Sequence, residues 1–555
     1  MAGSIRNHLE ALYGPAAGAL TVQSLQQLLE RFRARAPVHS DQTARPLSQS
    51  DAILITYGDQ LREPERLPLA TLADFAAENL ADTVSAIHIL PFFPWSSDDG
   101  FSVKDFFAVD PALGGWSDIA KLRQNFELMF DAVFNHMSAQ GEWFQRFQKG
   151  DPEFRDFFVT VAGNPDLSRV IRPRALPLLT EFQSQDGPFK VWTTFSADQV
   201  DLNVKNPAVL LRLIEALLFY VEQGARFIRL DAIAFLWKEI GTTCLHLPQT
   251  HRIIQLMRAV LDEVAPPVLL ITETNVPHQD NISYFGDGTN EAQLVYNFAL
   301  PPLVLHSLAT GNASKLTHWA QSLQLPTDVV TFFNFLSSHD GIGLNPARGI
   351  LSPEEIDALV VRAQAHGGFV SYKQNPDGSR SPYELNVTYF DALSNPADDE
   401  PMEVQVKRFI AAHAIMLAIA GVPGIYFHSL FGSRNDRAGA ENSGMPRRIN
   451  RQKLERTDLE DELADPTSLR ARVFGAFREL LAMRRAHQAF APAAAQRVLD
   501  LDPRVFAVLR ETADGTDRML CLHNVSNETL QVKPLDEALG TQMLAPYETS
   551  WITVR

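Results

Sequence analysis

Charged and polar side chains follow several short apolar runs of this sequence, each at the point where a run ends. The residues in these positions are Asp131, Asn135 and His136; Arg229 and Asp231; Glu273; and His339 and Asp340. Hydrophobic segments rarely end in unpaired charge, because burying such a charge is costly. Each residue taken alone has a structural explanation, as an ion pair, a helix cap or a hydrogen-bonded core histidine. The whole set, spread over different runs, indicates a shared site.

Two carboxyl groups with different protonation states are needed to cleave a glycosidic bond with retention of configuration. One attacks, and we expect Asp231 in this role, because Arg229 two residues earlier would point to the same side of a strand and lower its pKa. The other protonates the leaving oxygen, and Glu273 fits if neighbouring carboxylates or an apolar wall keep it protonated. Asp340 would hold sugar hydroxyls and stabilise the positive transition state. The two histidines can hydrogen-bond hydroxyls beside the cleaved bond.

The apolar runs alternate with longer segments, and this alternation predicts the fold that positions these residues. Eight of them are rich in β-branched residues, and most gaps between them can hold a helix. They cover residues 51–58, 85–91, 127–136, 225–232, 268–274, 294–300, 329–340 and 424–429. Such alternation is typical of parallel strands buried on both faces, and it predicts the α/β class and a closed (β/α)₈ TIM barrel. A doubly wound open sheet also fits the alternation, but no glycine-rich phosphate loop follows the first run.

Segments outside this alternation predict the other domains. We expect a helical N-terminal extension over residues 1–50, ending in a polar segment, and a catalytic barrel over residues 51–489. Two gaps, about 137–215 after the third strand and about 341–400 after the seventh, predict inserted subdomains at the strand ends where barrel enzymes place active sites. Short alternating segments over residues 490–555 predict a C-terminal antiparallel β domain.

Bulk composition excludes more functions than it identifies. The 555 residues include 49 basic and 66 acidic side chains, a net charge of −17, which gives a nucleic-acid partner no electrostatic support. Cys244 and Cys521 are the only cysteines, too few for a disulfide framework or a metal cluster. The charged N-terminal residues and the lack of a run of about 18 apolar residues predict neither a signal peptide nor a membrane partner. We therefore expect a cytoplasmic protein, with a homodimer left open.

Four motifs resemble the signature regions of glycoside hydrolase family 13, the α-amylase superfamily, in the family's order. They are DAVFNH, FIRLDAIAF, LLITETN and FLSSHD. The resemblance covers most of residues 50–555. It implies a retaining mechanism on α-glycosides, with Asp231 as nucleophile, Glu273 as acid/base and Asp340 as transition-state stabiliser.

Further motifs resemble the sucrose phosphorylase subgroup of that family more than the amylases. They are HILPFFPWSSDDGFSVKDF, IRPRALP, TTFSADQVDLN, FALPPLVLHSL, SSHDGIGL and RRINR. This resemblance implies that Asp98 and Phe101 pocket the terminal glucose and that Arg451 contacts it. It also implies that Arg174 and Tyr383 bind phosphate, which an arginine fork can grip bidentately. Without the resemblance, the Arg-Pro-Arg segment would be taken as a solvated turn and the phenylalanine as core.

Two features depart from the sucrose phosphorylase pattern. Glu384 replaces a glutamine that helps to hold fructose there, and those enzymes typically lack the extension of residues 1–50. With ITETNVPHQDNISYFG after the acid/base, these features resemble the glucosylglycerate phosphorylases of the same subgroup. Glycerate is an anion, so Arg434, Arg447 and Arg448, after the eighth strand, are candidates to bind it. Glu384 would bond glycerate hydroxyls or pair with one of these arginines, because facing the carboxylate would be repulsive.

The predicted reaction is a double displacement. Asp231 attacks the anomeric carbon while Glu273 protonates the departing glycerate, and phosphate then attacks the β-glucosyl enzyme to give α-glucose 1-phosphate. Inorganic phosphate is a co-substrate, and we expect no cofactor and no metal, although Asn135 matches a position near a structural calcium in amylases. The alternatives are a sucrose or glucosylglycerol phosphorylase, a hydrolase or transglucosylase, and a non-catalytic binding barrel. The three carboxylates argue against the last of these.

Overall fold

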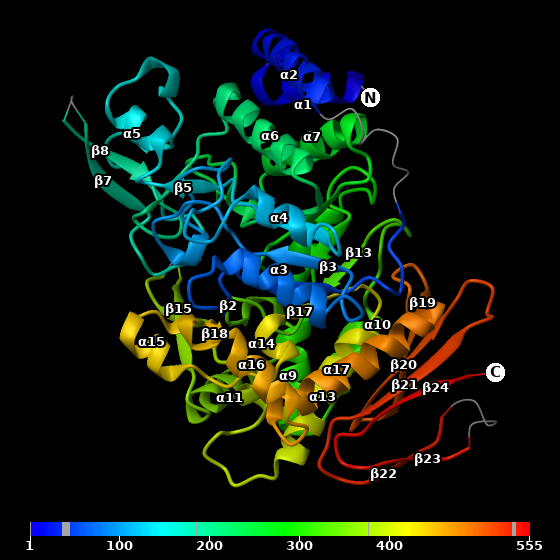
Figure 1. Ribbon diagram of the computed structural model, residues 1–555. Helices are drawn as coiled ribbons and strands as arrows, with labels where there is room; N and C mark the ends of the chain where they lie inside the picture. Colours follow the sequence, from blue (N-terminus) through cyan, green and yellow to red (C-terminus); the bar gives the residue numbers. More distant parts are fainter. Residues whose placement is uncertain (1, 36–44, 185–186, 376, 535–539, 555) are drawn as a thin grey trace.

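Eight parallel strands close into a barrel at the centre of the computed structural model (Figure 1). The structure describes residues 2–35, 45–184, 187–375, 377–534 and 540–554. In chain order the barrel strands are β1 (Ile53–Thr56), β3 (Ala86–Ile89), β4 (Glu127–Ala132), β10 (Ala225–Leu230), β11 (Leu269–Thr272), β12 (Leu294–Tyr296), β13 (Thr331–Asn334) and β17 (Val422–Tyr426). Each strand overlaps one of the eight apolar runs, so the prediction of a (β/α)₈ barrel is confirmed.

Helices follow the barrel strands along the chain. They are α3 (Pro68–Asn79), α4 (Trp116–Leu122), α6 (Pro207–Glu222), α7 (Pro248–Val264), α8 (His278–Ile282), α9 (Leu300–Thr310), α10 (Ser314–Gln321), α13 (Met402–Ala418) and α17 (Leu469–Ala486). Local sequence sets their ends, as α6 shows. The Asn206 side chain accepts the backbone N–H of Ala208, and Pro207 suits the first helical position. Gly224, with φ of 95°, then turns the chain into β10.

Two insertions leave the carboxyl ends of barrel strands. The first, between β4 and α6, contains β5 (His136–Ser138), α5 (Glu142–Gln148), β6 (Thr160–Val161), β7 (Leu179–Ser184), β8 (Gly187–Trp192) and β9 (Gln199–Asp201). The second, between β13 and α13, contains β14 (Ile342–Gly343), α11 (Pro353–Ala365), β15 (Phe369–Gln374), β16 (Arg380–Asn386) and α12 (Tyr389–Leu393). Because α6 begins at Pro207, the first insertion ends inside the range of about 137–215 that the sequence suggested.

The segment after β17 lies beside β1. It contains α14 (Phe427–Leu430), α15 (Arg437–Ser443), the 3₁₀ helix η7 (Pro446–Asn450), β18 (Leu454–Glu455) and α16 (Arg456–Ala464). Strand β18 pairs in parallel with β2 (Leu61–Arg62), which follows β1. This pairing holds η7, which carries the two predicted site residues Arg447 and Arg448, near the segment that follows the first barrel strand.

The two ends of the chain pack on opposite parts of the barrel (Figure 1). Helices α1 (Ala2–Tyr13) and α2 (Pro15–Arg35) lie against α7 and α6, and Arg33 bonds Glu263 at 2.7 Å. Much of the polar segment predicted before the barrel, residues 36–44, lies outside the described residues. The C-terminal strands β19 (Ala495–Asp502), β20 (Val505–Glu511), β21 (Arg518–Asn524) and β24 (Thr549–Thr553) form an antiparallel sheet against α10 and α13, and β22 (Leu530–Val532) pairs with β23 (Gln542–Leu544). Among the described residues, every helix is too short or too polar to span a bilayer.

Candidate active site

The strand-end residues gather around one narrow cavity of about 70 Å³. Ten of the fifteen residues predicted for the site line it: Asp98, Phe101, His136, Arg174, Asp231, Glu273, His339, Asp340, Tyr383 and Arg447. A larger hollow of about 750 Å³ lies in the first insertion, next to Phe147 and Lys190, and none of the predicted residues lines it. The acid groups therefore locate the candidate site at the narrow cavity, not at the larger one.

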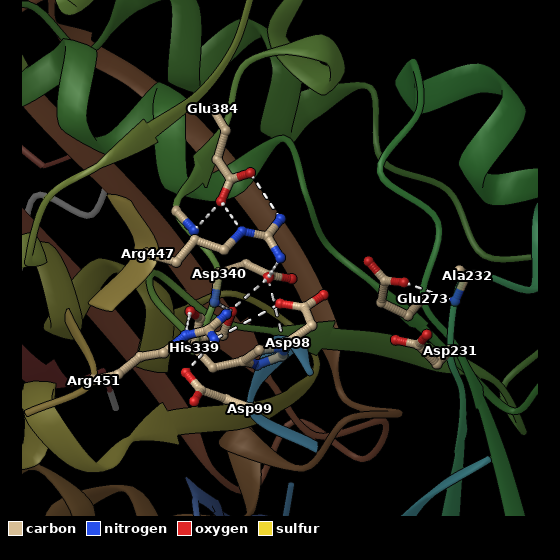
Figure 2. A network of polar contacts seen from close by, with 12 residues as sticks. Asp98, Asp99, Asp231, Ala232, Glu273, His339, Asp340, Glu384, Arg447 and Arg451 are labelled. Atoms are coloured by element: carbon tan, nitrogen blue, oxygen red, sulfur yellow. Dashed lines mark hydrogen bonds and ion pairs between the residues drawn. The ribbon is translucent and has the colours of Figure 1, made fainter. Parts of the chain in front are cut away.

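Asp231 and Glu273 share one buried arginine. They follow β10 and β11, which are neighbouring parallel strands, so their side chains reach the same edge of the barrel. Arg229 NH1 donates to Asp231 Oδ1 at 2.8 Å, and Arg229 NH2 lies 3.8 Å from Glu273 Oε2. Glu273 also accepts the backbone N–H of Ala232 at 3.0 Å, and Ala232 adopts a left-handed conformation with φ of 47° (Figure 2). A non-glycine residue in this conformation is a local strain of the kind found at functional sites.

The protonation of this pair follows from burial and from Arg229. Burial raises the pKa of both Asp231 and Glu273, and the guanidinium opposes the rise in both. Arg229 lowers the pKa of Asp231, as expected, but burial outweighs the arginine and the pKa lies above its ordinary value. Arg229 bonds Asp231 directly and only approaches Glu273, and this contact favours the negative charge on Asp231 and the proton on Glu273. Double displacement needs this division.

Asp340 belongs to a chain of ion pairs along the cavity (Figure 2). Arg447 NH1 lies 2.6 Å from Asp340 Oδ1, while Arg447 Nε and NH2 donate to Glu384 at 3.0 and 2.9 Å. Glu384 is 1% exposed and also accepts the backbone N–H of Gly341. Burial raises the pKa of Asp340, but the surrounding arginines, Arg447 foremost, bring it below its ordinary value. Asp340 is therefore held ionised.

Arg174 and Tyr383 lie together on the cavity wall. The guanidinium carbon of Arg174 is 5.9 Å from the centre of the Tyr383 ring, and Arg174 NH1 is 3.6 Å from Glu384. Within the part of the chain that the structure describes, Arg174 forms this ion pair but no side-chain hydrogen bond, so its donors remain open to a ligand. Burial raises the pKa of the Tyr383 hydroxyl, which keeps its proton.

A strained turn brings two aspartates to the other side of the cavity. In the 3₁₀ turn η2 (Asp98–Gly100), φ is 54° at Asp98, 47° at Asp99 and 109° at Gly100. A Cβ on Gly100 would lie 2.4 Å from the carbonyl oxygen of Pro91, so only glycine fits there. Asp98 lines the cavity, while Asp99 accepts a hydrogen bond from the buried Arg451 at 2.8 Å. Arg451 thus supports the turn from beneath, and Asp99, which the sequence did not single out, anchors it.

Stacked rings form the wall next to this turn. Phe101 lies on His339 with 4.6 Å between ring centres and 8° between planes. His136 Nε2 lies 2.9 Å from the carbonyl oxygen of Phe101 and 3.2 Å from the side-chain amide of Gln199. Burial lowers the pKa of both histidines, so both are neutral. Gln199 and Phe195 line the cavity too, and the only sign of them in the sequence was the motif TTFSADQVDLN.

Of the three arginines predicted for an anionic acceptor, the structure brings Arg447 to the cavity lining. Arg434 bonds Asp391 Oδ1 at 2.8 Å and also Gln405, so its charge is already compensated outside the cavity. Arg448 lies 3.8 Å from Asp99 and is not part of the lining either. The geometry therefore gives no support to an acceptor role for Arg434 or Arg448.

A lysine lies beside Asn135, the residue that matches a position near a structural calcium in amylases. Lys238 Nζ lies 2.6 Å from Asn135 Oδ1 and 2.7 Å from Asp201 Oδ2, and all three side chains are buried. Its ammonium compensates the charge of Asp201 and holds the start of the first insertion. Across residues 2–35, 45–184, 187–375, 377–534 and 540–554, no group of three or more His, Cys, Asp or Glu side chains is arranged to hold a metal ion. The sequence reading missed Lys238, whose signal is a lone lysine in the apolar stretch DAIAFLWK.

Comparison with known proteins agrees with this architecture. Residues 82–341 match the family model described as alpha amylase, catalytic domain. The crystal structure of sucrose 6F-phosphate phosphorylase from Thermoanaerobacter thermosaccharolyticum matches with a TM-score of 0.76, covering 92% of this chain and 99% of that one. At 24% identity this match supports the fold alone. The fold, the acid pair and the family model together define a barrel enzyme of the α-amylase family, glycoside hydrolase family 13.

Two relatives narrow this class. The chain is 52% identical to a glucosylglycerate phosphorylase of Allomeiothermus silvanus, over 99% of this chain and 98% of the relative. It is 46% identical to a glucosylglycerate phosphorylase of Escherichia coli (strain K12), with 100% of both chains covered. The chain therefore belongs to the glucosylglycerate phosphorylase family, as the motifs after Glu273 and the N-terminal extension predicted.

Proposed function

We propose that this protein is a retaining glycoside phosphorylase that converts 2-O-α-glucosylglycerate and phosphate into α-glucose 1-phosphate and glycerate. The observation that carries the proposal is the arrangement at one narrow cavity. Asp231 and Glu273 form an acid pair around Arg229 there, and Arg174 presents open donors to the same space. The relatives that bear this activity in their names support it over the whole length of the chain.

In the first half-reaction, a carboxylate oxygen of Asp231 attacks the anomeric carbon as the bond to the glycerate oxygen breaks. Glu273 gives its proton to that oxygen, and a β-glucosyl ester on Asp231 remains. Asp340, kept ionised by Arg447, lies where it can stabilise the positive charge that develops on the sugar ring. Glycerate leaves with the proton from Glu273.

In the second half-reaction, phosphate occupies the space that glycerate has left. The Glu273 carboxylate takes a proton from the phosphate as a phosphate oxygen attacks the anomeric carbon and the ester to Asp231 breaks. The product is α-glucose 1-phosphate, and both acids return to their starting states. Arg174 and the protonated hydroxyl of Tyr383 would bind the phosphate.

The Arg174 guanidinium is also the best candidate to bind the carboxylate of glycerate. Arg447 is already shared between Glu384 and Asp340, whereas Arg174 has open donors. Because glycerate departs before phosphate enters, one arginine can serve both anions in turn. Glu384 takes the second of its two predicted roles and pairs with Arg447.

Neither half-reaction needs a metal or an organic cofactor, and we propose that the protein uses none besides phosphate as co-substrate. Activity that persists after dialysis against EDTA supports this part of the proposal. A cytoplasmic location and a homodimer also belong to the proposal. Cell fractionation and light scattering of the purified protein test them.

The test is the release of glucose 1-phosphate in phosphate buffer, with glucosylglycerate, glucosylglycerol and sucrose supplied in parallel. We expect strong release from glucosylglycerate and a loss of about 10⁴-fold in Asp231→Asn. Asp391→Asn is the matched control, because Asp391 is another buried aspartate paired with an arginine, but outside the cavity. Its activity should stay near the wild-type level.

A preference for sucrose would keep the mechanism and overturn the acceptor. Release of free glucose without glucose 1-phosphate would contradict the phosphorylase proposal. It would make the protein a hydrolase and remove the role given to Arg174 and Tyr383.

A further inference from the structure

A buried row of polar side chains lies beneath the acid pair, on barrel strands that are neighbours in the order β3, β4, β10 and β11. His88 on β3 and Asp131 on β4 are 0% exposed, and Arg229 on β10 is 2% exposed. His88 Nε2 lies 2.7 Å from Asp131 Oδ2, and Arg229 NH1 bonds Asp131 Oδ1. The two carboxylate oxygens of Asp131 are thus divided between a histidine and the arginine that contacts both catalytic acids.

The direction of these hydrogen bonds follows from the protonation states. Although burial raises it, Arg229 and His88 bring the pKa of Asp131 down to about 2, so Asp131 is an acceptor only. Burial lowers the pKa of His88, and Asp131 offsets this only in part, so the imidazole is neutral. Its single N–H must therefore be on Nε2 and donate to Asp131. Within the described residues, His88 Nδ1 is buried without a hydrogen-bond partner, so the contact with Asp131 fixes the tautomer.

Asp131 and Asp231 share one nitrogen atom of Arg229. Arg229 NH1 contacts Asp131 Oδ1 and also Asp231 Oδ1, the latter at 2.8 Å. A tighter hold by Asp131 would draw NH1 toward Asp131 and away from Asp231. The hydrogen bond from His88 draws charge toward the other oxygen of Asp131 and so weakens that hold.

We propose that His88 is a positioning residue for the reaction, which acts through Asp131 to keep Arg229 available to Asp231 and Glu273. The inference rests on the proposed retaining mechanism but not on the identity of the acceptor. Without the His88 donor, Asp131 binds Arg229 more strongly, and its unshared charge acts more strongly on both acids. Asp131 already raises the pKa of both. Losing the donor should raise both further.

The sign of the effect on activity follows from the state each acid needs. Asp231 must be ionised, so its pKa sets the acidic limb of the pH profile; Glu273 must be protonated, so its pKa sets the basic limb. Raising both moves the whole profile to higher pH. A change at His88 alone removes none of the other charged groups that face the pair: Arg229, Asp340, and, around Asp340, Arg174, Arg447 and Arg451.

The experiment compares His88→Gln with His88→Asn. The longer glutamine amide can reach Asp131 from the position of the Nε2 atom, whereas the asparagine amide ends short of it. We expect His88→Asn to shift both limbs of the kcat/KM profile upward by about half to one pH unit, and His88→Gln to restore the wild-type limbs. His413→Asn is the matched control, because His413 is a buried histidine of α13 bonded to the backbone oxygen of Phe409. It should lower the melting temperature and leave both limbs unchanged.

The inference would be overturned if the limbs of the kcat/KM profile had the same pKa values in His88→Asn and His88→Gln. It would also be overturned if the His413 control shifted the limbs by the same amount. If either His88 variant fails to fold, the ¹⁵N signals of His88 in the wild-type protein decide instead. A protonated Nε2 and a bare Nδ1 from pH 6 to 8 would support the inference, and the opposite tautomer would overturn it. Failure of the proposed function would appear separately, as wild-type release of glucose rather than glucose 1-phosphate, while the limbs can be measured on either product.

Discussion

Arginines in two regions of this molecule are compensated in different ways. At the barrel mouth, Arg229, Arg447 and Arg451 contact carboxylates, which outweigh burial and raise the pKa of each guanidinium. At the junction between the barrel and the C-terminal sheet, Arg484 and Arg510 contact backbone carbonyls instead. Burial lowers the pKa of Arg484 to about 9 and that of Arg510 to about 10. Both therefore remain charged near pH 7, although neither forms an ion pair with a carboxylate among the described residues.

The difference reflects what each region has to do. At the mouth, the arginines lie between acids whose charge changes during the reaction, so they set pKa values. At the junction, the partners are carbonyl oxygens of chain segments that must meet. Arg484 reaches Gln49, Asp51, Gly421 and Phe490, and Arg510 reaches Ala418, Ala491, Ala494 and Ala495. We infer that the mouth arginines control reactivity and the junction arginines control stability.

The strongest way to break this comparison is Arg447→Met. The change removes the nearest cation of both Glu384 and Asp340, and removing one partner of a buried pair costs about 3–5 kcal/mol. We expect kcat to fall by about 10²–10³-fold, because Asp340 loses the cation that contributes most to keeping it ionised and in place. The measurements are product release and the midpoint of urea unfolding. Arg434→Met is the matched control, since Arg434 pairs with Asp391 outside the cavity and should change kcat less than about twofold.

The double variant Arg447→Met, Glu384→Met separates stability from catalysis. Removing Glu384 as well leaves one unpaired carboxylate fewer, so part of the lost stability should return while activity does not. Full activity in the double variant would show that the mouth arginine serves stability alone.

A smaller effect is expected from Arg510→Met at the junction. Several carbonyl oxygens lose their donor, and we expect a loss of about 2–3 kcal/mol, seen as a lower unfolding midpoint, with kcat of the folded protein unchanged. Arg510→Lys should not rescue it, because a single ammonium cannot reach carbonyls spread around a planar fork. A fall in kcat at an unchanged midpoint would contradict the division between the two regions.

The barrel and most of the site could be predicted from the sequence because both depend on local signals. Runs buried on both faces predict parallel strands, and charged residues at the ends of such runs predict the mouth. His88 gave no such signal, since it lies within a strand and its partner Asp131 is on the next one. The registers of the barrel strands, which place these groups together, are set by tertiary packing.

The arginines after β17 show most clearly which contacts could not be predicted from the sequence. Arg434, Arg447 and Arg448 are equivalent in sequence, and only the fold shows that Arg434 meets Asp391 while Arg447 meets Asp340. Glu384 is a second example. The sequence shows a glutamate at this position where sucrose phosphorylases have a glutamine. Its burial between Arg447 and a backbone N–H, however, depends on the pairing of β14 with β16. Partners that are distant in the chain cannot be assigned from residue types alone.

Lowering the pH gives the smallest expected effect. As the pH falls, a histidine at the junction takes up a proton before Asp131 at the mouth does. His523 on β21 donates from Nδ1 to the carbonyl of Phe506, and its Nε2 accepts the indole N–H of Trp551 at 3.2 Å. Burial lowers the pKa of His523 from 6.5 to about 4, whereas the pKa of Asp131 is about 2. Between pH 6.5 and 4 the unfolded chain binds a proton at His523 that the folded protein does not, so stability falls as the pH falls through this window. At one pH unit below 6.5 the loss is roughly 1 kcal/mol for such a histidine.

Protonation would also give Nε2 a hydrogen that faces the indole N–H, so Trp551 should report the change. We expect its fluorescence to change between pH 6.5 and 4 while far-ultraviolet circular dichroism of the barrel stays constant. Trp551→Phe identifies the signal, and His523→Leu should flatten the decline of the unfolding midpoint in the same window, at the cost of lower stability near pH 7. A midpoint that declines equally in wild type and His523→Leu would mean that other groups carry the acid sensitivity. In that case His523 would not contribute to the pH dependence of the junction's stability. The contrast between junction and mouth would then depend on the arginines alone.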